Sequence, residues 1–107
     1  MTRHDDERVC DILDATQQVA TIVAGGETAF RADRVRQLAV ERLLEIIGES
    51  ARAMSEAGRG RYPGAPWADI VGLRTLLAHH YHRVDPNQVW VIATVSVPEL
   101  ARLLSAR

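Results

Sequence analysis

The chain has 107 residues, with 13 basic residues against 14 acidic ones, a formal net charge of −1 and one cysteine. This length fits a single domain, residues 1–107, and is too short for two. The near-neutral charge argues against a protein that grips nucleic acid with its whole surface, so any phosphate binding must be local. Cys10 alone excludes an internal disulfide and a cysteine-based zinc site, and we expect it to be buried in the first helix.

Two helices are predicted in the first half of the chain. Apolar residues recur at three-to-four spacing from Asp5 to about Ala24, and Gly25-Gly26 ends that helix. A second helix should run from about Asp33 to Ala57, followed by a glycine-rich terminator. The expected buried faces comprise Val9, Ile12, Leu13, Val19, Ile22 and Val23, then Val35, Leu38, Ala39, Leu43, Ile46, Ile47, Ala51 and Met54.

A third helix is predicted from Trp67 to about His80, with Pro66 at its start. This segment is apolar nearly all round, because Leu73 and Leu76 widen the face that Ile70 begins. A helix of this kind in a small domain usually packs against its own bundle and against another chain.

A fourth helix should begin at Asp85, which can serve as its N-cap before Pro86, with Gln88 able to complete a capping box. Its continuation, VWVIATVSV, suits a strand by propensity, but a lone strand would have no pairing partner, so we expect a helix. Residues 96–99, Ser-Val-Pro-Glu, resemble a second capping signal and predict a kink or break before a last short helix. The predicted fold is therefore all-α, an up-down four-helix bundle with a short extra C-terminal helix.

Polar residues capable of chemistry gather at the end of the third helix, in the stretch LRTLLAHHY. Arg74 falls in phase with Ile70, Ala78 and Tyr81, where an aliphatic side chain would be usual. A structural ion pair with Glu45 or Glu49 would explain it equally well.

Three histidines, His79, His80 and His82, follow beside Tyr81. Imidazole moves protons near neutral pH and guanidinium binds phosphate, so an Arg and a His together can cleave phosphodiesters without a metal. A metal site at His79 and His82, with Asp85 nearby, is the competing interpretation. It lacks further Cys or His ligands apart from His4, and we expect no metal and no cofactor.

These residues resemble the HepT family, the toxin members of the HEPN superfamily, whose mark is an Arg, four to six intervening residues and a His, followed two residues later by a Tyr. Here these are Arg74, His79 and Tyr81. The segments LAVERLLEIIGES, YPGAPWADIVGLR and VDPNQVW, residues 38–50, 62–74 and 84–90, are also similar to the family. The resemblance covers most of the chain.

The resemblance implies a HEPN-like fold and a metal-independent ribonuclease toxin of a type VII-like toxin–antitoxin pair. It implies a homodimer in which Arg74 and His79 of both protomers line a cleft for RNA. It further implies an MntA-type nucleotidyltransferase antitoxin that silences the toxin by transferring AMP to Tyr81. The family commonly has Asn after the motif Arg, and this chain has Thr75.

Helical geometry constrains how these residues meet. At about 100° per residue, Arg74 and Tyr81 are about 20° apart around the helix axis, whereas Arg74 and His79 are about 140° apart. Either the helix unwinds near His79, or Arg74 of one chain joins His79 of another. Thr75, His80, His82 and Arg83 are candidate supporting or RNA-contacting residues. The alternative function is a non-catalytic helical dimer that binds a nucleotidyltransferase.

The first ten residues lack the apolar core of a signal peptide, and no apolar run is long enough to cross a bilayer. We therefore expect a cytoplasmic protein without a membrane partner.

Overall fold

The computed structural model describes residues 3–78 and 85–105, and for Arg3, Arg74 and Ala78 it describes the backbone. The described part is helical and contains no strand, which confirms the predicted all-α class. Its elements are α1 (Arg3–Val23), α2 (Glu27–Ala32), α3 (Arg34–Ala53), α4 (Glu56–Gly60), α5 (Trp67–Ala78), α6 (Pro86–Val91), the π-helical segment η1 (Ile92–Ser96) and α7 (Val97–Ser105).

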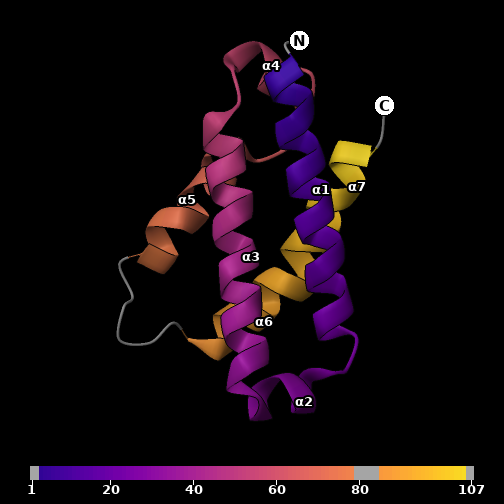
Figure 1. Cartoon of the computed structure of the whole chain (residues 1–107), viewed down its shortest axis with the longest axis vertical. Coiled ribbons are helices and arrows are strands. Elements are labelled where there is room, and N and C mark those ends of the chain that lie inside the picture. Colours follow the sequence, from indigo (N-terminus) through magenta and orange to yellow (C-terminus); the bar gives the residue numbers. More distant parts are fainter. Residues whose placement is uncertain (1–2, 79–84, 106–107) are drawn as a thin grey trace.

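The two long helices, α1 and α3, lie side by side and run in opposite directions (Figure 1). Helix α5 packs against α3, and the continuous segment α6–η1–α7 crosses behind the pair and packs mainly against α1. The arrangement is a four-helix bundle in which α2 and α4 are short connecting helices.

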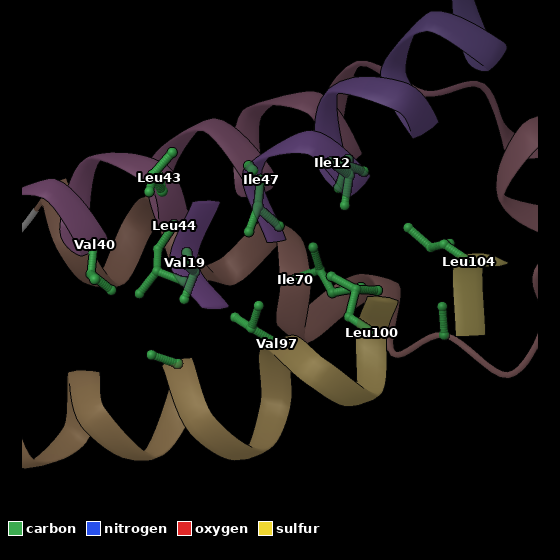
Figure 2. Packing of buried hydrophobic residues seen from close by; sticks show 14 of the residues in the cluster. Ile12, Val19, Val40, Leu43, Leu44, Ile47, Ile70, Val97, Leu100 and Leu104 are labelled. Carbon is green, nitrogen blue, oxygen red and sulfur yellow. The ribbon is translucent and has the colours of Figure 1, made fainter. Parts of the chain in front are cut away.

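Aliphatic side chains from all four long segments form one core (Figure 2). Ile12 and Val19 of α1 meet Leu44 and Ile47 of α3, and all four are fully buried. The remaining buried apolar residues include Phe30, Val40, Leu43, Ala51, Ile70, Leu77, Val89, Ala93, Val97, Leu100 and Leu104. Each long helix therefore contributes one face to a single core, as the apolar spacing predicts.

The short helix α2 was not predicted, and it changes which face of α3 is buried. Phe30 of α2 is fully buried and its ring lies 5.3 Å from that of Trp90. Gln37 is also buried, because its Nε2 donates to the carbonyls of Phe30 and Arg31 at 3.0 and 3.1 Å and so satisfies the end of α2.

With Gln37 turned inward, the start of α3 presents a different side to solvent from the one expected. The prediction that Val35 and Leu38 are buried is wrong: they are 74% and 48% exposed. Val40 and Leu44 lie inside instead, about one and two turns after Gln37.

The second predicted helix ends earlier than Ala57. Helix α3 ends at Ala53, and Ser55 caps a separate helix, α4, by accepting a hydrogen bond from the N–H of Gly58 at 3.0 Å. The carboxylate of Asp5 also holds Ser55, by accepting from its backbone N–H and its hydroxyl. A serine held by two partners outside α3 explains why the helix stops there.

The predicted break near residues 96–99 is a widened helical turn, not a break. The backbone is helical at both Ile92 and Val97, and the N–H of Val97 donates to the carbonyl of Ile92 five residues earlier. Pro98 lacks an N–H and its ring would clash with the carbonyl four residues before it, so a π-turn at this point accommodates the proline. The helical assignment of VWVIATVSV is confirmed.

Cys10 is exposed, so its predicted burial is also wrong. It follows Val9, which is buried, and lies about 200° around α1 from Ile12, which is fully buried. This places Cys10 on the outer face of the helix.

Candidate active site

The motif helix α5 begins at a firmly anchored residue. The indole Nε1 of Trp67 donates to the carbonyls of Arg59 and Tyr62, both at 3.1 Å. The guanidinium of Arg59 in turn donates to the carbonyl of Ala51 at 2.9 Å, at the end of α3. These bonds connect the start of α5 to the end of α3 and fix where the motif helix begins.

Along α5, one side is buried and the flanks are only partly covered. Ile70 and Leu77 are buried, whereas Val71, Leu73 and Leu76 are half-buried. The bundle therefore leaves part of this apolar helix uncovered, as its nearly continuous apolar surface predicts.

The structure places the first part of the predicted site and not the rest. Arg74 belongs to α5, one turn after the buried Ile70, so its backbone lies on the side of the helix that faces the bundle. Thr75 is exposed. The other predicted site residues, His79, His80, Tyr81, His82 and Arg83, lie outside the described residues, and so does the side chain of Arg74.

The two competing explanations, an ion pair of Arg74 and a metal site, stay open because the side chains they need lie outside the described residues. Glu45, one of the two acids predicted to pair with Arg74, lies 3.9 Å from Arg42. The described residues hold no group of three His, Cys, Asp or Glu side chains suited to a metal. His79 and His82, the proposed metal ligands, are outside those residues.

The chain returns to the described structure at the predicted start of the fourth helix. The carboxylate of Asp85 accepts from the N–H of Asn87 at 2.9 Å, and Pro86 occupies the first turn, so the predicted cap is confirmed. Gln88 adds no capping bond in the part of the chain that the structure describes. In the sequence, residues 79–84 thus fall between α5 and the capped start of α6.

Much of the positive charge on the described surface is neutralised. Exposed arginines pair with carboxylates on their own helix or its immediate flank, at 2.7 Å for Arg31 and Glu27 and 3.2 Å for Arg34 and Glu41. The other pairs are Arg36 with Asp33, Arg42 with Glu45 and Arg102 with Glu99. This pattern agrees with local phosphate binding and not with a broad basic surface.

In the described residues, no helix is long and apolar enough to cross a bilayer.

Comparison with known proteins gives consistent matches. A family model described as "Ribonuclease HepT-like" matches residues 12–107. The protein named "Putative RNase MJ1380" of Methanocaldococcus jannaschii is 33% identical over 93 residues, which cover 86% of this chain and 85% of the relative. "Putative RNase MJ0127" of the same organism is 34% identical over 92 residues, 86% of this chain and 71% of the relative.

A protein named "Probable ribonuclease HepT" of Thermococcus cleftensis is 34% identical over 71 residues, 66% of this chain and 64% of the relative. No solved structure matches the chain.

Proposed function

Because the chain belongs to the HepT-like ribonuclease family, we propose that it is a metal-independent endoribonuclease toxin whose catalytic residues are Arg74 and His79. The observation that carries the proposal is the family match over residues 12–107, which contains an Arg and a His at the spacing of the family motif. The relatives carry the names "Putative RNase" and "Probable ribonuclease HepT", and these names support the same reaction class.

The reaction is an internal displacement on the RNA. The 2′-oxygen forms a bond to the adjacent phosphorus, the bond from phosphorus to the 5′-oxygen breaks, and a cyclic phosphate and a 5′-hydroxyl result. His79 moves the proton that leaves the 2′-hydroxyl and reaches the 5′-oxygen. Arg74 stabilises the charge that develops on the phosphate oxygens. Proton transfer of this kind contributes about 10² to 10⁴ in rate, and the cation contributes about 3 kcal/mol more.

The active form is a homodimer with a composite site. On a regular helix, Thr75 lies between the directions of Arg74 and His79, about 100° from the first and about 40° from the second. Thr75 is exposed, so this side of α5 is accessible to a second copy. A second copy placed there brings its own motif helix next to that of the first chain, and Arg74 of one chain can then meet His79 of the other.

Tyr81 is the proposed site at which the ribonuclease activity is regulated. We expect the partner to be an MntA-type nucleotidyltransferase antitoxin that transfers AMP to the phenol, in the cytoplasm. Because Tyr81 and Arg74 are about 20° apart on a regular helix, the added charge and bulk would lie where the RNA phosphate binds.

A non-catalytic helical dimer that binds the nucleotidyltransferase is the alternative function. The observation that favours it is Thr75, which replaces the amide of the family motif. A binding module would not require a histidine at position 79, and this favours the enzyme.

The test compares RNA cleavage by the wild-type chain, Arg74→Ala and His79→Ala, with circular dichroism to confirm that all three fold. We expect both variants to lose at least about 10²-fold in rate, and we expect the wild-type rate to survive a chelator. Full activity in both variants would contradict the proposed site, and an inactive wild-type dimer that still binds the nucleotidyltransferase would support the alternative.

A further inference from the structure

An open apolar groove lies between α5 and the segment η1–α7. It has a volume of about 420 Å³ and opens to solvent where these two helices separate. Ile47 of α3 forms its floor, and its walls are mainly aliphatic, with Ile70 and Leu73 on one side and Val95 and Leu100 on the other. Figure 2 shows Ile70 and Leu100 projecting into the space between their helices. Helices α5 and α7 pack less closely on each other than either packs on its neighbour among α1 and α3.

The two charged residues that line the groove, Asp69 on α5 and Glu99 on α7, are both acidic. Asp69 is exposed and makes no ion pair or hydrogen bond within the described part of the chain. Glu99 lines the groove as well, and its hydrogen bonds from Arg102 hold the pKa of the Glu99 carboxyl below its ordinary value. Among the described residues, no basic side chain lines the groove. Because Arg102 already pairs with Glu99, Asp69 is the carboxylate that a partner cation can meet, and the groove suits an aliphatic surface that carries such a cation.

The groove is on the opposite flank of α5 from the proposed catalytic dimer contact. Leu73 lines the groove, whereas the exposed Thr75 faces the side where a second copy would complete the site. Residues two positions apart on a helix point about 200° apart. The exposed apolar residues of α3, Val35 and Leu38, are not part of the groove lining either. A dimer formed at Thr75 leaves the groove accessible.

We propose that this groove binds an amphipathic helix of a partner protein, with its aliphatic side chains in the groove and a basic side chain against Asp69. Two helices that flank an apolar floor form the kind of groove that receives a third helix. A salt bridge to Asp69 on the α5 wall would fix the direction of that helix. This proposal goes beyond the proposed function. It rests on that function in one respect: a second copy occupies the Thr75 side of α5 and leaves the groove free.

Val95 offers a direct test because it is both part of the groove and 63% exposed, so the substitution Val95→Glu is compatible with folding. Val91, one turn earlier and 54% exposed, is outside the groove lining, and Val91→Glu is the matched control. The probe is a fluorescent peptide of about four helical turns with leucines on one face and an arginine at one end of that face. A second peptide replaces the arginine with glutamate.

Fluorescence anisotropy measures peptide binding to the full chain. We expect the arginine peptide to bind, Val95→Glu to weaken binding at least about tenfold, and Val91→Glu to leave it unchanged. We expect Asp69→Arg to reverse the preference toward the glutamate peptide.

The proposal is overturned if neither peptide binds the wild-type chain, or if the two valine variants behave alike. A change of mass in solution on Val95→Glu alone would also overturn it, because the groove would then be a contact between copies. RNA cleavage by the wild-type chain, measured separately without peptide, decides the proposed function and does not affect this result.

Discussion

Asp5 and Ser55, fifty positions apart in the sequence, are joined by two hydrogen bonds. The carboxylate of Asp5 accepts from the backbone N–H of Ser55 at 2.9 Å and from its hydroxyl at 2.5 Å, and Asp5 is 2% exposed. Because Ser55 also caps α4, which leads to the start of α5, this contact links the N-terminus of α1 to the motif helix.

We predict that Asp5→Ala lowers the free energy of unfolding by about 1–3 kcal/mol, since it leaves a partly buried N–H without its acceptor. Asp6→Ala is the control: Asp6 shares the first turn of α1 but is exposed, so its loss should cost less than about 0.5 kcal/mol. Urea unfolding of both variants measures the difference. Equal losses would show that the charge near the helix end matters and the contact with Ser55 does not.

Gly58 packs directly against the same carboxylate. A Cβ atom at Gly58 would lie 2.6 Å from Cγ and 2.7 Å from Oδ2 of Asp5, whereas one at Gly60 would meet nothing within 4 Å. We predict that Gly58→Ala destabilises the protein by about 1–3 kcal/mol through overpacking. Gly60→Ala should stabilise it by about 0.4–1 kcal/mol, because alanine restricts the unfolded chain. Thermal unfolding of the pair checks the prediction, and a Gly58→Ala variant as stable as the wild type would contradict it.

The start of α3 shows which parts of the fold follow from periodicity and which do not. The apolar spacing correctly predicts the long helices, because each must bury one face whatever its neighbours are. It misplaces the buried face at the start of α3, because Gln37 is buried for a polar reason: it satisfies carbonyls at the end of α2. Six residues carry too weak a pattern to predict α2, so neither the buried Phe30 nor the exposure of Val35 could be inferred from the sequence.

The candidate site also has features that the sequence can predict and features that it cannot. Residue types point to Arg74 and the nearby histidines, because the chemistry of guanidinium and imidazole is local to each side chain, and the family resemblance favours His79 among them. The choice stays a prediction, because His79 lies outside the described residues. The groove beside α5 could not be predicted, since Leu73 and Val95 are far apart in the sequence and only the arrangement of two helices brings them to one surface. Which copy would supply each proposed catalytic residue likewise depends on the assembly and not on one helix.

The proposed composite site predicts that activity recovers when two inactive variants are mixed. In a dimer of one Arg74→Ala chain and one His79→Ala chain, one of the two sites has both wild-type residues and the other has neither. Unfolding and refolding an equal mixture should therefore restore about a quarter of the wild-type rate of RNA cleavage, because half of the dimers are mixed. Each variant refolded alone is the control. A mixture as inactive as its components would mean that both residues act within one chain.

A substitution at Thr75 is predicted to raise the rate of RNA cleavage, whereas Arg74→Ala and His79→Ala lower it. If an amide after Arg74 helps to hold the RNA or the histidine, Thr75→Asn should raise the rate of RNA cleavage, by about the threefold to tenfold that one added hydrogen bond allows. Thr75 is exposed, so the substitution should change the melting temperature little. Thr75→Val, which removes the hydrogen-bonding group, is the comparison. A rate unchanged in both variants would show that position 75 does not contribute to the site.

A substitution at Tyr81 tests RNA cleavage separately from the proposed silencing by a nucleotidyltransferase. Tyr81→Phe removes the hydroxyl proposed to accept AMP but keeps the ring, so the variant should cleave RNA within about tenfold of the wild-type rate and should resist silencing. The measurement is RNA cleavage before and after incubation with the nucleotidyltransferase and ATP, with mass spectrometry to detect the added AMP. The wild-type chain should gain AMP and lose activity, because the adduct adds negative charge beside the phosphate site. If Tyr81→Phe is modified and silenced as readily as the wild type, AMP must be attached elsewhere and Tyr81 is not the control point.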